Sequence, residues 1–358
     1  PVVSVSYDNN NVANGKYFKA ERKQWIKAVA DGSVISSDFL IKRIEEAFDL
    51  WREGTWASHL DFEEFCDYVL PYSPDDYYVL EDWRSRVAAQ IDSTVFERLA
   101  DFRYSSEMSH SAFWACKELN LSLMKRFDGD NATADDQKIY HIPTKTRVPY
   151  GTCKHFCDIN LMFMRSLGIP VAVDFTPQWP FRSMGHTWNV VLMNNGMTKS
   201  YGGCSDDLEQ MHKPDQKMAK VYRRTYSINE EILKLKSVEG VVPSTFSSPF
   251  IKDVTCDYMK TSDVSVRVSK GRCRHRYAYL AVFDNQNWVP ICYGKRKGHR
   301  FVFEDVGSRH KHLSYGVNSQ NRKCVANSIC MIRSQNDRPI FGNVFPSHIL
   351  YLPVSQVK

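Results

Sequence analysis

The chain has 358 residues, of which 43% are hydrophobic and 13% aromatic, and its net charge is +6. A chain of this size and composition can bury large cores, and we expect it to form two or three domains. A membrane-spanning helix needs about 18 consecutive apolar residues, and the sequence contains no such run. The composition therefore predicts no transmembrane segment.

The positive charge is concentrated toward the C-terminus. Residues 252–358 hold 18 Lys and Arg against 7 Asp and Glu, a balance of +11, which leaves −5 for residues 1–251. A basic surface attracts acidic polymers, although clustered like charges are most often solvated strand ends and turns. We expect any partner of this region to be a glycan or another polyanion, and we do not expect nucleic acid.

The ten cysteines are spread along the chain without a short regular spacing. In a chain of this length such a distribution does not predict a disulfide framework. The chain begins at Pro1, and the segment Ser4–Lys16 is polar and rich in asparagine. This beginning is typical of a chain from which a targeting segment has been removed.

Four helices are predicted in the first third of the chain. Apolar side chains recur at helical spacing in each of them, and breakers follow several. The predicted segments are Ser36–Gly54, Leu60–Leu70, Asp82–Ala100 and Ser109–Phe127. We expect residues 1–104 to form a helical N-terminal region that covers the layer built by the residues after it.

A longer apolar helix is predicted to begin at Cys153. Gly151 and Thr152 precede it, and it ends at the Gly-Ile-Pro sequence of residues 168–170. The segments that follow are a strand over 171–175, a loop over 176–185 and a second strand over 186–193. Cys153 should then lie on the first turn of a buried helix, and His186 should enter from a neighbouring strand.

A thiol at a helix start is a candidate nucleophile. The unpaired backbone N–H groups there carry partial positive charge, which favours the thiolate that attacks carbon. His186 follows Cys153 by 33 residues and is the candidate base. Cys157, one turn further along the helix, is more typical of a buried core cysteine.

The order of these elements resembles the transglutaminase-like superfamily. The matching residues are Gly151-Thr-Cys153 at the helix start, Leu167-Gly-Ile-Pro170 at the helix end and His186-Thr-Trp188 at the second strand. The resemblance covers residues 105–230. It implies an α+β fold with a papain-like core, in which the helix with Cys153 at its N-terminus packs on an antiparallel sheet. It also implies that Cys153 is the nucleophile and His186 the base.

The acid that orients the histidine is missing from its expected place. Members of this superfamily usually supply an Asp about 15 residues after the histidine, and such a third group fixes the imidazole tautomer. Here that position falls near Tyr201 and Gly202, and neither is an acid. The alternatives are Asp206 or Asp207, if the loop bends back, and Asn189, since an amide can also orient the ring.

The resemblance implies acyl transfer or hydrolysis at a protein or peptide amide. The Cys153 thiolate attacks the carbonyl carbon, releases ammonia or an amine, and leaves a thioester that an amine or water resolves. The oxyanion donors would be the Cys153 backbone N–H and one of Tyr150, Gln178 or Trp179. No cofactor is expected. No metal site is expected either, because Cys153-x₃-Cys157 lacks the second ligand pair of a zinc site.

The last part of the chain is predicted to be rich in β-strands. Residues 239–251 contain Gly, Pro and Ser breakers and are predicted to be a linker. Five runs of alternating pattern favour an antiparallel sandwich or barrel: 264–268, 277–283, 288–293, 300–303 and 348–352. The predicted organisation is a helical region over 1–104, a transglutaminase-like core over 105–238, the linker, and an all-β, sandwich-like domain over 252–358.

Two functions follow from the sequence as hypotheses. The first is a cysteine-dependent amide acyltransferase, peptidase or amidase that works through a Cys153 thioester. The alternative is a catalytically weakened transglutaminase-like scaffold that binds a glycan or another polyanion through its basic β domain. Many bacterial members of the superfamily are exported, so the resemblance implies a location in the periplasm or at the cell surface.

Overall fold

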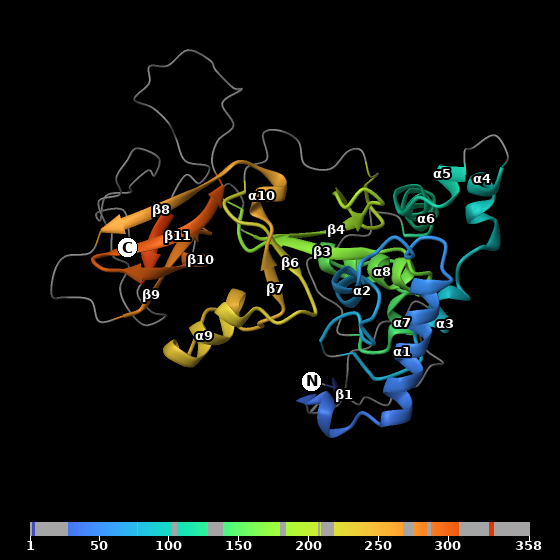
Figure 1. Cartoon of the computed structure of the whole chain (residues 1–358), viewed down its shortest axis with the longest axis horizontal. Coiled ribbons are helices and arrows are strands. Elements are labelled where there is room, and N and C mark those ends of the chain that lie inside the picture. The colour runs from blue at the N-terminus through green and yellow to red at the C-terminus, as the bar shows by residue number, and fades with distance from the viewer. Residues whose placement is uncertain are drawn as a thin grey trace, which may run out of the picture. The chain divides into compact units, whose positions relative to one another are not determined.

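The protein combines helices with antiparallel sheets, so the α+β class is confirmed. The computed structural model describes residues 2–3, 28–76, 78–101, 106–127, 139–179, 184–206, 208, 218–267, 275–284, 288–307 and 329–332. The chain divides into two compact units, Pro1–Val171 with Val191–Leu208, and Ala172–Val190 with Glu209–Lys358. Figure 1 labels most of the helices and strands.

The first unit is mostly helical. Its described helices are α1 (Ser37–Arg52), α2 (Phe62–Tyr68), α3 (Arg84–Ala88), α4 (Glu97–Ala100), α5 (Ser106–Ser109), α6 (Ala112–Arg126), α7 (Ile142–Lys145) and α8 (Cys153–Ser166), with 3₁₀ turns η2 (Asp31–Ser33) and η3 (Ser93–Phe96). It also holds the paired strands β1 (Val2–Val3) and β2 (Ala28–Val29), and β5 (Thr198–Tyr201). The helices predicted over 36–54, 60–70 and 109–127 are confirmed by α1, α2 and α6.

Side-chain caps determine where these helices begin. Ser36 accepts a hydrogen bond from Phe39 N at 3.2 Å at the start of α1. Asp61 and Glu64 form a reciprocal capping box at the start of α2. Each cap satisfies an N–H that has no partner inside the helix and contributes about 0.5–2 kcal/mol.

The single helix predicted over Asp82–Ala100 is wrong, because a cap interrupts it. Asp92 accepts a hydrogen bond from Thr94 N at 2.9 Å and one from the Thr94 hydroxyl at 2.8 Å. An Asp that bonds its own following backbone favours a new turn over continuation of the helix. The segment therefore folds as α3, η3 and α4 in succession.

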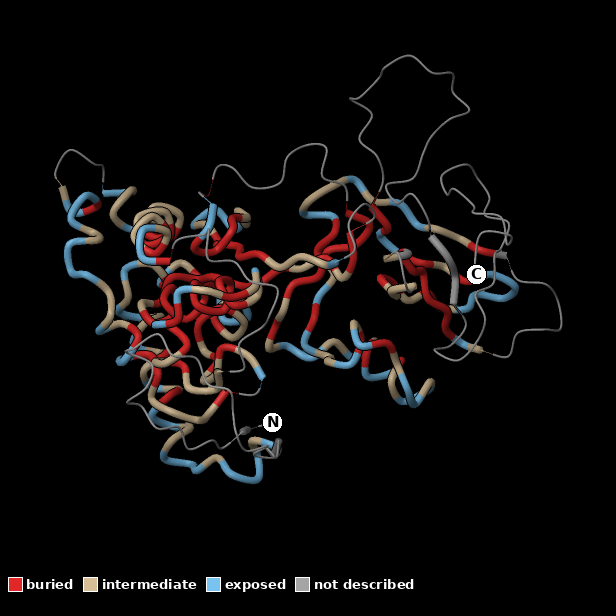
Figure 2. Tube along the Cα trace, turned by 180° about the vertical axis from the view of Figure 1, so that it is seen from behind, coloured by how far each residue is buried: buried red, intermediate tan, exposed pale blue. Residues whose placement is uncertain are grey.

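Helix α8 is the buried centre of the first unit. Twelve of its fourteen residues are buried, and its turns carry the colour of buried residues in Figure 2. Helices α3 and α6 pack against it. Gly168, just past its end, has a φ of +75°, the left-handed conformation that terminates helices and favours glycine. The helix predicted from Cys153 to this glycine is confirmed.

Besides the β1–β2 pair, the described strands form two five-stranded antiparallel sheets. The first has the order β5-β4-β3-β6-β7. Its strands besides β5 are β4 (His186–Leu192), β3 (Val171–Thr176), β6 (Tyr222–Arg224) and β7 (Ile251–Asp253). Strands β3 and β4 confirm the predictions for 171–175 and 186–193. Strand β3 pairs with β6 in the register that sets Asp174 opposite Arg223. A carboxylate on one strand therefore faces a guanidinium on the next.

The second sheet has the order β12-β9-β10-β11-β8. Its strands are β8 (Thr261–Arg267), β9 (Tyr277–Phe283), β10 (Trp288–Lys297), β11 (Arg300–Gly307) and β12 (Ile329–Ile332). They confirm the strands predicted at 277–283, 288–293 and 300–303 and the described part of 264–268, whereas 348–352 lies outside the described residues. The sandwich or barrel stays a prediction. The core of this sheet includes Leu280, Ile291 and Phe301.

The segment between β6 and β7 packs within the second unit. It holds α9 (Glu230–Glu239) and η5 (Ser244–Phe246). The Phe246 ring lies 6.0 Å from the ring of Tyr279 and 5.2 Å from that of Tyr293. These contacts bring part of the stretch predicted as a linker, 239–251, onto the strands β9 and β10.

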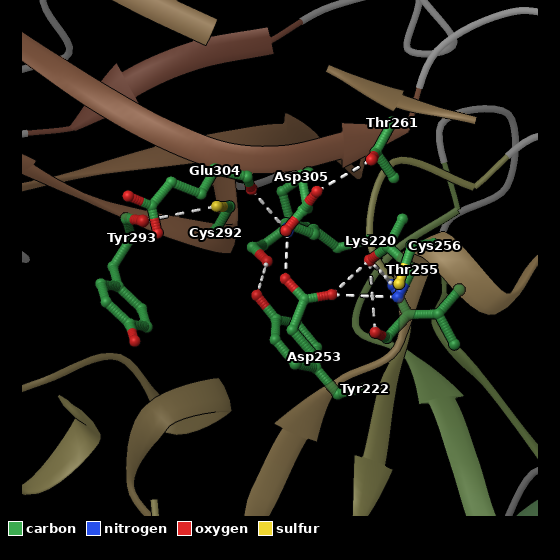
Figure 3. Close-up of polar contacts among 12 residues, drawn as sticks. Lys220, Tyr222, Asp253, Thr255, Cys256, Thr261, Cys292, Tyr293, Glu304 and Asp305 are labelled. Atoms are coloured by element: carbon green, nitrogen blue, oxygen red, sulfur yellow. Dashed lines mark hydrogen bonds and ion pairs between the residues drawn. The ribbon is translucent and has the colours of Figure 1, made fainter. Parts of the chain in front are cut away.

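A buried polar cluster lies where β6 and β7 meet the second sheet (Figure 3). Lys220, only 1% exposed, forms an ion pair with Asp253 and donates to a backbone carbonyl of β11 at 2.7 Å. The Thr255 hydroxyl donates to Asp253 Oδ1 at 2.6 Å and accepts from Val221 N at 3.0 Å. Thr255 opens the one-turn helix α10 (Thr255–Tyr258), so the cluster fixes the position of that helix.

Candidate active site

Thr152 caps α8 and sets Cys153 in its first turn. The Thr152 hydroxyl accepts a hydrogen bond from His155 N at 3.3 Å. Cys153 is exposed and its thiol is free. The N–H groups of a helix start carry partial positive charge. The predicted nucleophile is therefore an accessible thiol at a helix N-terminus.

Gly151 is required by the close approach of His155. A β-carbon added at residue 151 would lie 2.5 Å from the His155 ring. His155 is fully buried, and its Nε2 lies 3.2 Å from Val148 O. The Gly-Thr-Cys motif thus has a local physical reason, because glycine admits the histidine ring and threonine caps the helix.

A buried carboxylate anchors the next turn of α8. Asp158, 1% exposed, accepts from Lys154 Nζ at 2.7 Å, from Lys145 Nζ at 3.3 Å and from the Tyr78 hydroxyl at 3.2 Å. A buried carboxylate is costly unless it is paired and hydrogen-bonded. These partners pair the buried charge through Asp158 Oδ2 and tie α7 to α8, which holds the first turn of α8 in place.

The other described cysteines are poorer nucleophiles than Cys153. Four of them are buried: Cys116, Cys157, Cys204 and Cys292. Burial raises the pKa of three of these thiols to about 12, and raises the pKa of Cys157 well above its ordinary value. Desolvation and nearby acids also raise the pKa of Cys66 and Cys256. Thiols of this kind are inert near neutral pH.

His186 begins β4 beside two indoles. The centroid of its ring lies 6.0 Å from that of Trp179 and 5.7 Å from that of Trp188, with tilts of 31° and 33°. Both tryptophans are at most 2% exposed. Gly185 precedes the histidine because a β-carbon there would lie 2.7 Å from the carbonyl oxygens of residues 176–177. Indole faces at about this distance stabilise a cation, and a base becomes a cation when it accepts a proton.

The turn after β5 bends back and brings Asp206 to Gly202. Ser205 N and Asp206 N both donate to Gly202 O, at 3.1 and 3.0 Å, and Cys204 takes a left-handed φ of +62°. A β-carbon added at residue 202 would lie 2.5 Å from Asp206 Oδ2. The Asp206 carboxylate therefore occupies the space in which a side chain at residue 202 would begin.

The other predicted residues are distributed over both units. Gln178 is buried, and its Nε2 donates to Trp179 O at 3.0 Å. Asn189 is fully buried on β4, and Tyr150 is partly buried just before α8. Asp207 lies outside the described residues. The first unit contains Tyr150, Cys153 and Asp206, and the second contains Gln178, Trp179, His186 and Asn189.

Comparison with protein-family models, curated proteins and solved structures finds no match to this chain. The resemblance to the transglutaminase-like superfamily therefore rests on the motif residues of this chain.

Sequence reasoning missed a polar network beside Trp188. Asp174, fully buried on β3, accepts two hydrogen bonds from Arg223, at 2.8 and 2.9 Å, and one from the Tyr258 hydroxyl at 2.6 Å. The Tyr258 hydroxyl in turn accepts from Trp188 Nε1 at 2.8 Å. The signal in the sequence is an acid inside the otherwise apolar run 171–175, because such a residue needs a buried partner.

Within the described residues, no group of three or more His, Cys, Asp and Glu side chains is arranged to hold a metal ion. None of the described helices is both long enough and apolar enough to cross a membrane.

Proposed function

We propose that this protein is a cysteine enzyme that performs acyl transfer or hydrolysis at a protein or peptide amide. Cys153 is the nucleophile and His186 the base, on a papain-like core of the transglutaminase-like type. The observation that carries the proposal is the contrast among cysteines: Cys153 is exposed at a capped helix start, whereas burial or neighbouring acids raise the pKa of the other described thiols.

The proposed reaction starts with proton transfer from the Cys153 thiol to the His186 imidazole. The thiolate attacks the amide carbonyl carbon, and the C–N bond breaks as the imidazolium gives its proton to the departing amine or ammonia. Water or a primary amine then attacks the thioester while His186 accepts its proton. The Cys153 sulfur leaves as the thiolate, so each cycle restores the starting state without a cofactor.

The surroundings of His186 support its role as the base. Its ring lies beside the indoles of Trp179 and Trp188, and indole faces attract a cation. They would therefore stabilise the imidazolium that forms after proton transfer. For the oxyanion we propose the Cys153 backbone N–H together with one donor from Tyr150, Gln178 or Trp179.

For the acid that orients His186 we favour Asp206. Its carboxylate fills the space above Gly202, the position near which the resemblance expects an acid. Asp206 thus compensates for the glycine by reaching back from four residues further along the chain. Asn189 and Asp207 are the alternatives, and the first of these has its amide buried on the same strand as His186.

The alternative function is a non-catalytic scaffold that binds a glycan or another polyanion through its basic C-terminal part. The observation in its favour is Gly202 itself, because loss of an orienting acid weakens a dyad. The same superfamily resemblance leads us to propose a periplasmic or cell-surface location for either function.

A peptide pool with a small amine tests the proposed function without knowledge of the substrate. The protein is incubated with a tryptic digest of a bacterial lysate and hydroxylamine, and mass spectrometry counts peptides that gain a hydroxamate, lose ammonia or are cleaved. We expect such products with the wild-type protein and a loss of about 10³-fold or more in Cys153→Ser, because the nucleophile is removed.

Cys256→Ser is the matched control, since Cys256 is the other exposed cysteine among the described residues. It should leave the yield of modified peptides unchanged. Equal and negligible yields from the wild type and Cys153→Ser would reject the enzyme and leave the binding scaffold as the function.

A further inference from the structure

We propose that Tyr258 and Asp174 are positioning residues, which hold the Trp188 indole against the His186 ring and so keep the base in its reactive orientation. The inference rests on the proposed function of His186. Every residue that it uses belongs to the second unit.

Strand pairing brings the network together. His186 and Trp188 are two apart on β4 and therefore lie on the same face of the sheet, with ring centroids 5.7 Å apart. Asp174 lies on β3, which is next to β4 in the sheet, and it faces Arg223 on β6. Tyr258, the last residue of α10, connects these strands through its hydroxyl.

The direction of each hydrogen bond in the chain is determined by its chemistry. An indole N–H can only donate, and an ionised carboxylate can only accept. The Tyr258 hydroxyl must therefore accept from Trp188 Nε1 at 2.8 Å and donate to Asp174 Oδ2 at 2.6 Å. Burial, and then the Asp174 carboxylate, raise the pKa of Tyr258 well above its ordinary value, so the hydroxyl keeps the proton that it donates.

The Tyr258 ring also packs against Trp188, with centroids 5.6 Å apart and an interplanar angle of 80°. This edge-to-face contact and the hydrogen bond constrain the indole from two directions. Since Trp188 is fully buried, its ring has little freedom to move away from His186. An aromatic wall held in this way limits the rotation of the imidazole.

The helix that carries Tyr258 is itself fixed by buried groups. Thr255, its first residue, bonds to Asp253 and Val221, and Asp253 pairs with Lys220 (Figure 3). A helix of one turn has little stability of its own. The polar cluster therefore supplies the rigidity that α10 lacks and sets the reach of Tyr258.

The composition of the network argues for positioning rather than for stability alone. A buried ion pair is often no more stabilising than apolar residues of the same volume. Both members of the Asp174–Arg223 pair are buried, so apolar residues would fill the same space at a lower cost in free energy. The pair does, however, hold the Tyr258 hydroxyl, and through it the Trp188 indole, in a single geometry.

A double-mutant cycle on Cys153 reactivity tests the inference. The rate of Cys153 alkylation by iodoacetamide at pH 7 is measured by mass spectrometry in the wild type, Tyr258→Phe, Trp188→Phe and the double variant. Each single variant removes the same hydrogen bond and keeps an aromatic ring. Loss of about 1.4 kcal/mol of positioning, the size of one hydrogen bond, predicts about a tenfold slower rate.

Because both variants remove the same interaction, the double variant should be no slower than the slower single variant. Tyr222→Phe is the matched control. Its hydroxyl is also buried in the second unit, but it donates to Ile291 O at 2.8 Å and not to the network around Trp188. It should lose similar thermal stability and alkylate Cys153 at the wild-type rate.

Three results would overturn the inference: a wild-type rate in Tyr258→Phe, an equal loss in Tyr222→Phe, or losses that multiply in the double variant. His186→Ala separates this failure from that of the proposed function. If His186→Ala leaves the Cys153 rate unchanged, the base assignment itself is wrong. If it slows Cys153 and Tyr258→Phe does not, only the positioning role is wrong.

Discussion

The two sheets of this protein bury different chemistry. Strands β3, β4 and β6 bury Asp174, Asn189 and Arg223. Among the side chains of β8, β9, β10 and β11 whose burial the structure describes, none that is charged or an amide is buried. The second sheet packs apolar side chains such as Leu280 and Phe303 into its core. Each buried polar group costs free energy unless it is satisfied. The first sheet therefore depends more than the second on satisfied polar contacts in its interior, and it is the sheet to which the proposed base His186 belongs.

Two ion pairs, one on each sheet, show the same contrast. Arg223 and Asp174 are buried, and their side chains are 10% and 0% exposed. Lys295 of β10 and Glu231 of α9 are each 40% exposed. A pair in water contributes little, whereas breaking a buried pair leaves a charge without a partner. Substitutions that break the buried pair should therefore lower the free energy of unfolding more than substitutions that break the exposed pair.

The largest effect is expected from Arg223→Met. It leaves the buried Asp174 carboxylate without its cationic partner, which should lower the free energy of unfolding by about 3–5 kcal/mol. The matched substitution Lys295→Met breaks the exposed pair and should cost less than about 1 kcal/mol. Urea unfolding of both variants measures the difference. Similar losses in the two would remove the distinction between the sheets.

The next effect concerns the acid that follows β5. Asp206→Asn should lower the yield of modified peptides by about 10²-fold, within the range that general acid–base groups contribute. Gly202→Ala should have a similar effect, because its β-carbon would meet Asp206 Oδ2 at 2.5 Å and displace the carboxylate. Unchanged yields in both variants would exclude Asp206 as the orienter and favour Asn189 or Asp207.

Rescue sharpens that assignment. In Gly202→Asp combined with Asp206→Ala, the acid returns to the place where the superfamily resemblance expects it. The carboxylate oxygen nearest to the new β-carbon is gone, and the Ser205 hydroxyl, at 2.8 Å, has to rotate away. We expect the double variant to recover most of the yield lost in Asp206→Ala alone. Failure to recover, in a protein that unfolds at the wild-type temperature, would count against an orienting acid at this turn.

A smaller effect is expected from Thr255→Val, which keeps the shape of the side chain and removes its hydroxyl. The variant loses the bonds of Thr255 to Asp253 and Val221 and should be less stable by about 1–3 kcal/mol, since Val221 N is left unsatisfied. If α10 depends on this cluster, Cys153 alkylation should slow as well. A loss of stability with an unchanged rate would separate the cluster from the site.

The smallest effect at neutral pH is expected from the ionisation of the buried tyrosines, which changes the stability only in alkali. Burial raises the pKa of Tyr222 and Tyr258 well above 10 in the folded state. Below about pH 10 both states are protonated, and above it only the unfolded chain ionises. Stability should therefore fall as the pH rises, by about 1.4 kcal/mol per pH unit for each such tyrosine. Tyr258→Phe should reduce this slope in urea titrations between pH 10 and 11.

Local patterns in the sequence predict much of the first unit. Ser36 before an apolar stripe predicts α1, and the Gly-Thr-Cys start with the glycine at 168 predicts α8, because caps and helix ends depend on neighbouring residues alone. The break at Asp92 also has a local cause, and its signal is the Asp itself. The helical spacing of the apolar residues in this segment predicts one continuous helix, and it is a stronger pattern than a single Asp.

The long-range parts of the site could not be predicted in the same way. The register of β3 and β6 pairs Asp174 with Arg223, which lie 49 residues apart, and no local pattern carries that information. Tyr258 reaches Trp188 from 70 residues further along the chain. The bend that returns Asp206 to Gly202 is a short-range feature, but it depends on a left-handed Cys204, a conformation that few non-glycine residues adopt.

The central claim is that His186 makes Cys153 reactive, and competitive alkylation tests it most directly. Limiting iodoacetamide at pH 7 should label Cys153 of the wild-type protein before Cys66 and Cys256, and His186→Ala should slow Cys153 by about 10²-fold and abolish that preference. Slow and uniform labelling of the three cysteines in the wild type, or an unchanged Cys153 rate in His186→Ala, would contradict the account.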